Sequence, residues 1–354
     1  FITYRIVLPL TGRLFVKSGV IGNRQTNKNK DNNMKLKYLA LVVIMVFGAA
    51  PTQASLFGSW FGVNSEPAKT QHPIVLIPGI FAFDSIAGVD YWYQIPEALE
   101  SQGATVFIPQ INAFDSSAKR GERLIAQLEN IRAASSGKIR KFNLMGHSQG
   151  GVTARYVMNV RPDLVASVTT MHTPHKGSPI ADVATGVLPD DSVQGDLGKA
   201  VANAVGDLVN LLSGNRGDKS DIDAMLGEFT ADGAAAFNAR FPAGVPETAC
   251  GNGPESVNIA GHTIRLYSWS GTSTFTTGID LSDAMFGTTS LAIDGPSDGI
   301  TGRCSSHFGK VLKDNYRMNH IDVNNHVLGL VSIFETNPKT LFRNHANRLK
   351  NAGL

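Results

Sequence analysis

The pentapeptide Gly-His-Ser-Gln-Gly at residues 146–150 constrains the fold of this chain more than any other feature. It follows the apolar run 142–145 and precedes segment 152–158, in which apolar residues recur at spacings of three to five. A strand, a serine between glycines and a helix in this order are typical of a nucleophile elbow, where the turn crowds the backbone. The alternative is an ordinary glycine-rich turn. Such a turn does not require a strand before it and a helix after it, whereas both are indicated here. The sequence therefore predicts Ser148 at the apex of a strained turn.

Apolar runs elsewhere in the chain predict the rest of the fold. Continuous apolar runs indicate strands buried on both faces of a parallel sheet. Such runs lie at 73–77, 105–108, 142–145 and 165–171, with a later strand expected at 263–270. Helix-like stretches at 91–102 and 120–134 separate them, and alternating strands and helices favour right-handed βαβ units. We therefore predict an α/β fold with a mostly parallel sheet and with the serine at the carboxyl edge of a central strand.

The first 54 residues do not resemble the rest. Residues 1–33 look unlike a folded segment, and we interpret them as non-native or untranslated upstream sequence, with translation beginning at Met34. Residues 34–54 combine a basic start, an apolar run at 38–50 and small residues at Thr52 and Ala54, which is typical of a secretory signal peptide. The apolar run is shorter than the about 20 residues of a membrane anchor, and its flanks disfavour a buried core helix. We expect secretion, no transmembrane anchor in the mature protein, and one domain at 55–354.

The charge and the cysteine content of that domain bear on its partners and on its disulfide bonding. The first 54 residues hold eight of the 32 Lys and Arg residues and one of the 29 acidic residues. The remainder has 24 basic and 28 acidic side chains, a net charge of −4, so the basic balance of the whole chain does not indicate a nucleic-acid partner. The two cysteines, Cys250 and Cys304, would meet an oxidising compartment, which favours one disulfide over two free buried thiols.

Segment 190–213 has one strongly apolar helical face. Five residues share that face at steps of three or four: Leu197, Val201, Val205, Leu208 and Leu212. Two interpretations remain open, a helix that packs into the core and a mobile lid over an apolar site.

Ser148 needs a base and a carboxylate to act as a nucleophile, and in α/β-hydrolases these follow the serine in the order acid, then histidine. Loop carboxylates downstream are Asp280, Asp294 and Asp298, and downstream histidines are His172, His175, His262, His307, His320, His326 and His345. Asp298 before Gly299 and His320 after Asn319 fit turn positions best, but spacing alone leaves the choice open. An oxyanion would need two backbone N–H donors, for which Gln149 and Ile80 are the candidates.

Long segments resemble one family, the secreted Pseudomonas-type triacylglycerol lipases, over residues 72–354. The similar segments are 83–85, 88–92, 146–148, 160–164, 174–178, 267–271, 314–320 and 345–352. The resemblance implies an α/β-hydrolase fold, Ser148 as nucleophile, Asp298 as acid and His320 as base. It also implies Ile80 and Gln149 as oxyanion donors, a Cys250–Cys304 bridge, a lid at about 191–214, and a dedicated periplasmic foldase as a partner during maturation.

The resemblance also implies one structural Ca²⁺. Its ligands would be the side chains of Asp280 and Asp322 and the main-chain oxygens of His326 and Leu330. From the sequence alone, Asp322 and Asp280 read as N-caps of helices, with a helix-like stretch at 323–334, although oxygen ligands suit a hard cation. Two positions depart from the family: His326 replaces glutamine, and Pro78 replaces a histidine beside the oxyanion loop and removes a backbone donor.

These features predict a secreted serine ester hydrolase that acts on triacylglycerol at an oil–water interface. A carboxylesterase for short soluble esters is the nearest alternative. An inactive hydrolase fold that only binds a ligand is the alternative from another class.

Overall fold

The computed structural model describes residues 66–80, 90–186, 196–213 and 219–354. The chain divides into two units, residues 1–64 and 65–354, and the described residues all belong to the second. The predictions for residues 1–33 and for the signal peptide at 34–54 lie outside the described residues. Within the described ranges, no helix has both the length and the apolar character needed to cross a membrane.

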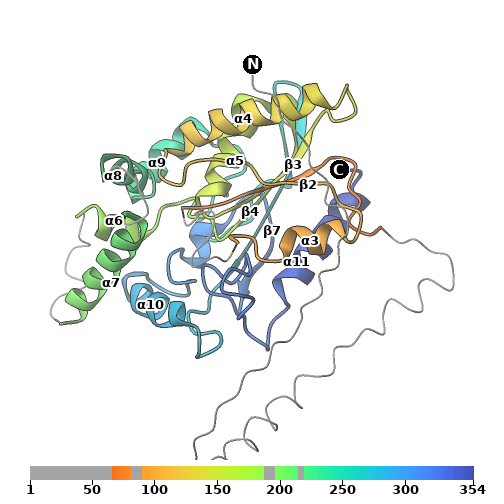
Figure 1. The fold of residues 1–354 in the computed structure, drawn as a ribbon. Coiled ribbons are helices and arrows are strands. Elements are labelled where there is room, and N and C mark those ends of the chain that lie inside the picture. The colour runs from red at the N-terminus through yellow and green to blue at the C-terminus, as the bar shows by residue number, and fades with distance from the viewer. Residues whose placement is uncertain (1–65, 81–89, 187–195, 214–218) are drawn as a thin grey trace, which may run out of the picture. The chain divides into compact units, whose positions relative to one another are not determined.

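A seven-stranded sheet forms the centre of the second unit (Figure 1). Its strands are β1 Ile74–Ile77, β2 Val106–Phe107, β3 Phe142–His147, β4 Val165–Met171, β5 Ser256–Ile259, β6 His262–Gly271 and β7 Lys310–Tyr316. The order β2-β1-β3-β4-β6 is parallel throughout. Beyond β6, the first half of that strand pairs antiparallel with β5 and the second half pairs parallel with β7. All residues of β1, β3 and β4 are buried, as their continuous apolar runs predicted.

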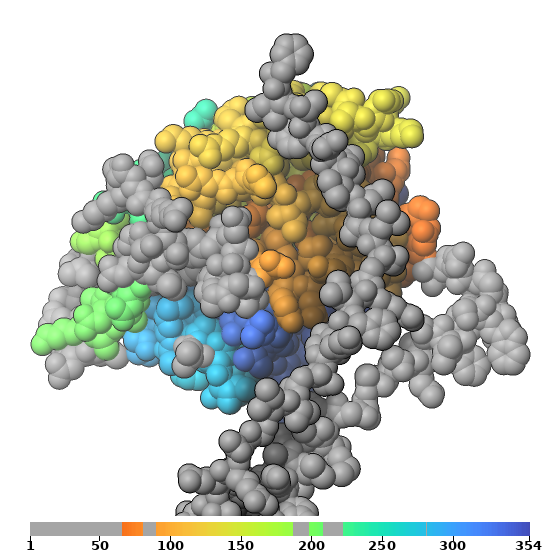
Figure 2. Space-filling model, in the orientation of Figure 1, coloured from red at the N-terminus to blue at the C-terminus, as the bar shows by residue number. Residues whose placement is uncertain are grey.

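Helices cover both faces of this sheet (Figure 1). They are α3 Ile95–Glu100, α4 Ser117–Ala134, α5 Gln149–Val160, α6 Pro179–Ala184, α7 Asp196–Ser213, α8 Lys219–Gly227, α9 Ala231–Arg240, α10 Leu281–Thr289 and α11 Pro338–Asn351. Short 3-10 turns lie at Pro162–Leu164, Ser290–Ala292 and Arg303–Ser306. Helix α7 packs against α10, and Figure 2 shows them in green and cyan at one side of the molecule.

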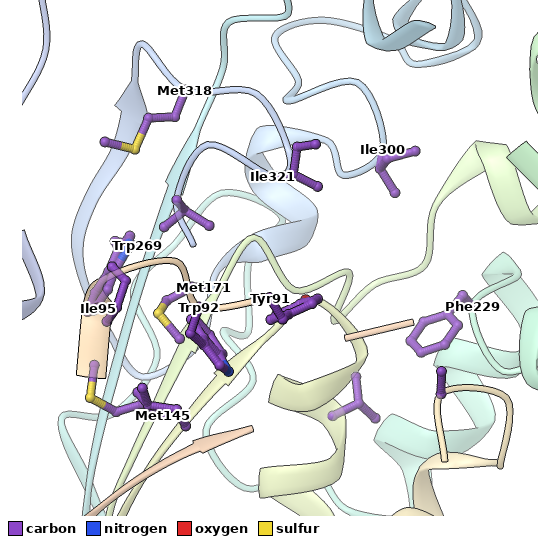
Figure 3. Packing of buried hydrophobic residues seen from close by; sticks show 14 of the residues in the cluster. Tyr91, Trp92, Ile95, Met145, Met171, Phe229, Trp269, Ile300, Met318 and Ile321 are labelled. Atoms are coloured by element: carbon purple, nitrogen blue, oxygen red, sulfur yellow. The ribbon is translucent and has the colours of Figure 1, made fainter. Parts of the chain in front are cut away.

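Alternate residues of β1 enter two separate apolar clusters because successive strand side chains point to opposite faces. Ile74 and Leu76 pack with side chains of α3 and α11, and Figure 3 shows part of this cluster around Trp92 and Met145. Val75 and Ile77 pack with side chains of α4 and α5. The sheet is therefore fixed from both faces, and the carboxyl ends of β1, β3 and β4 meet at one edge.

The structure differs from the sequence prediction in two helical segments. The first helix spans only 95–100 rather than 91–102, because residues 91–94 form a turn in which Gln94 has φ 58° and Pro96 opens the helix. The helix predicted at 323–334 is wrong, since this segment forms successive turns with positive φ at Asn325 and Leu328. The amides of Asn324 and Asn325 donate to the carbonyls of Tyr91 and Tyr93, which favours turns over helix.

Cys250 and Cys304 form a disulfide. The alternative of two free thiols is therefore wrong. The bridge connects the segment before β5 to the 3-10 turn six residues after Asp298.

Candidate active site

Ser148 sits between β3 and α5 in a strained conformation, with φ 54° and ψ −127°. Its N–H donates to the carbonyl of Met171 on β4, at 2.9 Å. A Cβ at Gly146 would lie 2.3 Å from the carbonyl of Gly150, and a Cβ at Gly150 would lie 2.2 Å from the carbonyl oxygen of Ile77. Both glycines are therefore required by close backbone contacts, as an elbow demands.

The structure brings Ser148, His320 and Asp298 into one hydrogen-bonded chain. Ser148 Oγ lies 3.0 Å from His320 Nε2, and His320 Nδ1 lies 2.9 Å from Asp298 Oδ2. Because a carboxylate only accepts, His320 Nδ1 carries the proton and Nε2 accepts from the serine hydroxyl. All three side chains are at least 96% buried. This is the geometry that makes a serine nucleophilic.

Asp298 is held as an anion despite its burial. Its Oδ1 accepts from the N–H groups of Ile300 at 2.9 Å and Thr301 at 2.6 Å. Burial by itself raises the pKa of Asp298, but the adjacent His320 and His172 imidazoles outweigh it and hold the pKa well below its usual value. The acid is therefore charged at neutral pH and keeps His320 in the required tautomer.

Geometry separates the candidates that spacing left open. Asp294 is exposed, and Asp280 caps α10 by accepting from the N–H of Ser282. Five of the other histidines have partners outside the site or lie apart from it. Three of them form hydrogen bonds elsewhere: His175 with Arg155 and Thr170, His345 with Thr169 and Arg348, and His307 with Gly251 and Asp314. His326 packs beside Tyr91, and His262 begins β6. His172 is the exception, since its Nδ1 also contacts Asp298.

A second hydrogen-bonded chain connects the loop after β1 to the loop of His320. Gly79 N–H donates to Tyr91 Oη at 2.8 Å, and Tyr91 Oη lies 2.5 Å from His147 Nδ1. His147 Nε2 lies 2.8 Å from the carbonyl of His320, and because a carbonyl can only accept, Nε2 carries the proton and donates it to this hydrogen bond. In the neutral ring, Nδ1 therefore accepts a hydrogen bond from the Tyr91 hydroxyl. Burial lowers the pKa of His147 well below its usual value and keeps this ring neutral. Sequence reasoning did not assign this role to Tyr91 or His147, although His147 directly precedes the serine.

Two contacts hold the backbone at Pro78, the position where the family resemblance leads us to expect a histidine. Pro78 has no N–H, but its carbonyl accepts from the buried guanidinium of Arg120, and the next residue is bonded to Tyr91. The peptide unit between Pro78 and Gly79, directly before Ile80, is therefore held at both its carbonyl and its N–H group.

The two candidate oxyanion donors border the cavity beside Ser148. This cavity has a volume of about 40 Å³, and its walls include Ile80, Gln149, Val205, Phe229 and Ile300. Gln149 is the first residue of α5, where helix N–H groups have no intrahelical partner. The Gln149 side chain donates to the carbonyl of Asp115 and so is bonded outside the triad. The backbone N–H of Gln149 is the group that lies beside Ser148. Because Val205 lines this cavity, helix α7 lies beside Ser148; residues 191–195 and 214 of the predicted lid lie outside the described residues.

Asp280 and Asp322 form a buried acidic pair close to His320. Asp280 Oδ2 and Asp322 Oδ1 are buried and have no hydrogen-bond partner among the described residues. Burial, together with the charges of Asp280 and Asp283, raises the pKa of Asp322 to about 7. Two inward oxygens without donors fit a hard cation. His326 is buried and Leu330 partly buried on the turns that follow Asp322.

One further group could hold a metal by proximity. In the described part of the chain, one set of three or more His, Cys, Asp or Glu side chains has its ligand atoms within 4.8 Å of one another. Its members are His172, Asp298 and His320. Their hydrogen bonds to each other already account for this arrangement.

Comparisons with known proteins agree with this fold and site. Residues 72–258 match the family described as the alpha/beta hydrolase fold. The chain is 46% identical over 308 residues to a triacylglycerol lipase of Vibrio cholerae, covering 85% of this chain and 97% of that protein. It is 36% identical to a triacylglycerol lipase of Pseudomonas fragi, covering 82% and 99%. A mature Bacillus licheniformis lipase of known structure has a TM-score of 0.53 at 17% identity, covering 79% and 93%, and this similarity shows the fold alone.

The predicted fold class and family are thereby confirmed: the chain belongs to the α/β-hydrolase superfamily and, within it, to the bacterial triacylglycerol lipase family of the Pseudomonas type.

Proposed function

We propose that this protein is a secreted triacylglycerol lipase that uses Ser148, His320 and Asp298 to hydrolyse carboxylic esters. The observation that carries the proposal is the Ser148–His320–Asp298 hydrogen-bonded chain, beside a small apolar cavity whose walls include Ile80 and Gln149. The activity named for its relatives in Vibrio and Pseudomonas supports the substrate class.

The reaction proceeds in two acyl transfers. Ser148 Oγ attacks the ester carbonyl carbon while His320 Nε2 takes the hydroxyl proton, and Asp298 stabilises the resulting imidazolium. The N–H groups of Ile80 and Gln149 donate to the oxyanion. The intermediate collapses when the ester C–O bond breaks and His320 protonates the leaving alcohol. A water then gives a proton to His320 and attacks the acyl carbon. The bond between the acyl carbon and Ser148 Oγ breaks as His320 returns this proton to Oγ, which releases the fatty acid and regenerates Ser148.

Helix α7 is proposed as the lid over this site. Val201 and Val205 are 1% and 2% exposed, and Val205 lines the cavity beside Ser148. The cavity is small, about 40 Å³, and α7 forms part of its wall, so we expect α7 to move when a long acyl chain enters. Opening exposes the apolar face, which costs roughly 25 cal/mol per Å² in water and is favoured at an oil surface.

Replacing both Val205 and Leu208 with serine is expected to reduce hydrolysis of an emulsified long-chain triglyceride about tenfold more than hydrolysis of a dissolved short ester. The apolar face is lost while the reacting groups are unchanged, and a tenfold difference corresponds to about 1.4 kcal/mol. Initial rates on both substrates measure this, with Ala202→Ser on the exposed face of α7 as control. Equal losses on both substrates would instead support a core helix and the esterase alternative.

A structural Ca²⁺ is proposed at Asp280 and Asp322, with the main-chain oxygens of His326 and Leu330 as further ligands. The partnerless carboxylate oxygens support this assignment. Bound there, the ion would neutralise a buried pair of acids. Asp322 lies two residues after His320 and its Oδ2 accepts from the N–H of Asn319, so the occupied site would stiffen the segment that carries the base.

Removing calcium with a chelator is expected to lower the melting temperature by about 5–10 °C. An ion that binds only the folded state adds roughly 2.7 kcal/mol at a hundredfold excess over Kd, and 1 kcal/mol corresponds to about 2–4 °C in a domain of this size. Thermal unfolding with and without chelator measures the shift. The response should disappear in Asp322→Asn and persist in the exposed Asp294→Asn. An unchanged melting temperature of the wild type in the presence of the chelator would contradict the proposed calcium site.

Maturation and location are proposed from the sequence. Upstream sequence at 1–33, a signal peptide at 34–54 and a single domain at 55–354 are proposed from the residues themselves. Export to the medium through the periplasm with a dedicated foldase is proposed from the family resemblance. The basic start, apolar run and small residues at the end of the signal segment support export.

Hydrolysis rates over a series of acyl chain lengths, below and above substrate solubility, test the proposed function. A lipase should become much faster once long-chain substrate forms a separate phase. Rates that peak on dissolved short esters would favour the carboxylesterase alternative. An intact protein whose Ser148 is not labelled by an active-site-directed phosphonate would favour the inactive binding protein.

A further inference from the structure

A second histidine contacts the acid of the triad. His172 immediately follows β4 and is fully buried. Its Nδ1 lies 2.7 Å from Asp298 Oδ2, the same oxygen that His320 contacts at 2.9 Å. Asp298 Oδ2 therefore lies between two imidazole rings whose centroids are 6.0 Å apart.

The direction of this hydrogen bond follows from chemistry. The Asp298 carboxylate only accepts, so His172 Nδ1 carries a proton. Burial lowers the pKa of His172, and the charge of Asp298 only partly opposes it. The ring is thus neutral, its Nε2 has no proton, and that atom has no hydrogen-bond partner among the described residues. Among the described residues, the His172 ring therefore forms a hydrogen bond only with Asp298.

The backbone of His172 is held in a conformation that few non-glycine residues adopt. Its φ is 51°, its N–H donates to Trp269 of β6 at 3.2 Å, and its carbonyl accepts from Thr301 Oγ1 at 3.1 Å. Thr301 also donates its N–H to Asp298 Oδ1. Strain of this kind persists only where surrounding contacts fix it, and it is commonly found at functional sites. Here the fixing contacts come from the neighbouring strand and from the loop of the acid itself.

We propose that His172 is a positioning residue for ester hydrolysis, which holds Asp298 Oδ2 where it accepts the proton of His320 Nδ1. This role rests on the proposed function of Ser148, His320 and Asp298. Two backbone N–H groups fix Oδ1, and the two imidazoles fix Oδ2, so all four donors together define one orientation of the carboxylate. Without His172, the carboxylate can rotate away from His320 or accept from water, and His320 loses its alignment toward Ser148.

Two variants separate the hydrogen bond from the packing of the ring. His172→Gly removes the donor and suits the positive φ, whereas His172→Asn places an N–H donor close to the position of Nδ1 and also tolerates this φ. For a dissolved short ester, His172→Gly should lower kcat about tenfold, the size of one hydrogen bond to a charged group, with KM within about twofold of wild type. His172→Asn should recover most of kcat.

A matched control measures the effect of losing any buried histidine. His345 is fully buried on α11, contacts Thr169 of β4 and touches no member of the triad. His345→Ala should lower the melting temperature but leave kcat of the folded enzyme unchanged. An unchanged kcat in His172→Gly, or a folded His172→Asn no better than His172→Gly, would overturn the positioning role.

A spectroscopic measurement remains decisive if His172→Gly does not fold. In protein labelled with ¹⁵N-histidine, both imidazole protons bonded to Asp298 should give downfield NMR signals, and His320→Ala should remove one and leave that of His172. Loss of both signals, with the fold intact, would overturn the proposal. This readout does not require turnover, so a wild-type protein that keeps both signals but hydrolyses no ester would reject the proposed function instead.

Discussion

Replacing Ser148 with alanine is expected to lower kcat by a factor on the order of 10⁴ or more while the protein stays folded. The hydroxyl is the atom that bonds to the acyl group, and loss of a serine-hydrolase nucleophile leaves only binding and oxyanion stabilisation. Among the described residues the removed oxygen makes one hydrogen bond, to His320, so little stability should be lost. Steady-state kinetics on a soluble ester and a thermal melt measure both effects.

The control for this variant is a buried serine outside the site. Ser167 lies on β4, bonds to Asn143 and contacts no triad member, so Ser167→Ala should keep kcat. A fluorophosphonate should label wild type and Ser167→Ala but not Ser148→Ala. Substantial turnover by Ser148→Ala would show that another nucleophile performs the reaction.

Replacing Asp298 with asparagine is expected to lower kcat on the order of 10⁴-fold, as it does when the orienting aspartate of a serine protease is changed. The amide is neutral, and in either orientation its NH2 group faces two hydrogen-bond donors, so it cannot accept all four hydrogen bonds or stabilise a charged His320. The loss should be larger than that of His172→Gly, because both contacts to Oδ2 change at once.

Kinetics of Asp298→Asn beside Asp294→Asn test this assignment, because Asp294 is four residues away and exposed. Asp294→Asn should behave as wild type. A loss below tenfold in Asp298→Asn would indicate another acid, with Asp294 the first to consider.

The central strands β1, β3 and β4 could be predicted because each is buried on both faces. A strand with no solvent-facing side consists mostly of apolar residues, as in β1, and such a run is visible in the sequence. Strand β7 could not be predicted in this way. It contains Lys310, Lys313 and Asp314 and is mostly half-buried, so its pairing with β6 depends on contacts that its own residues do not reveal.

The site was only partly predictable from residues alone. The glycines around Ser148 identify the nucleophile because their crowding is local, but the acid and base come from loops whose meeting depends on the whole sheet. Spacing left three carboxylates and seven histidines open, and the family resemblance was needed to favour Asp298 and His320. His172 was among those candidates, yet no local pattern shows that its ring faces Asp298.

The hydrogen bond between Ser148 and His320 joins residues 172 positions apart, and the bond from Gly79 to Tyr91 continues through His147 to the same loop. Contacts between distant parts of a chain form slowly, because a long loop must close before they are gained. A polypeptide that has formed β1, β3 and α5 thus possesses a serine without its base. Such an intermediate is inert toward esters, so catalysis begins only when the last third of the chain has docked.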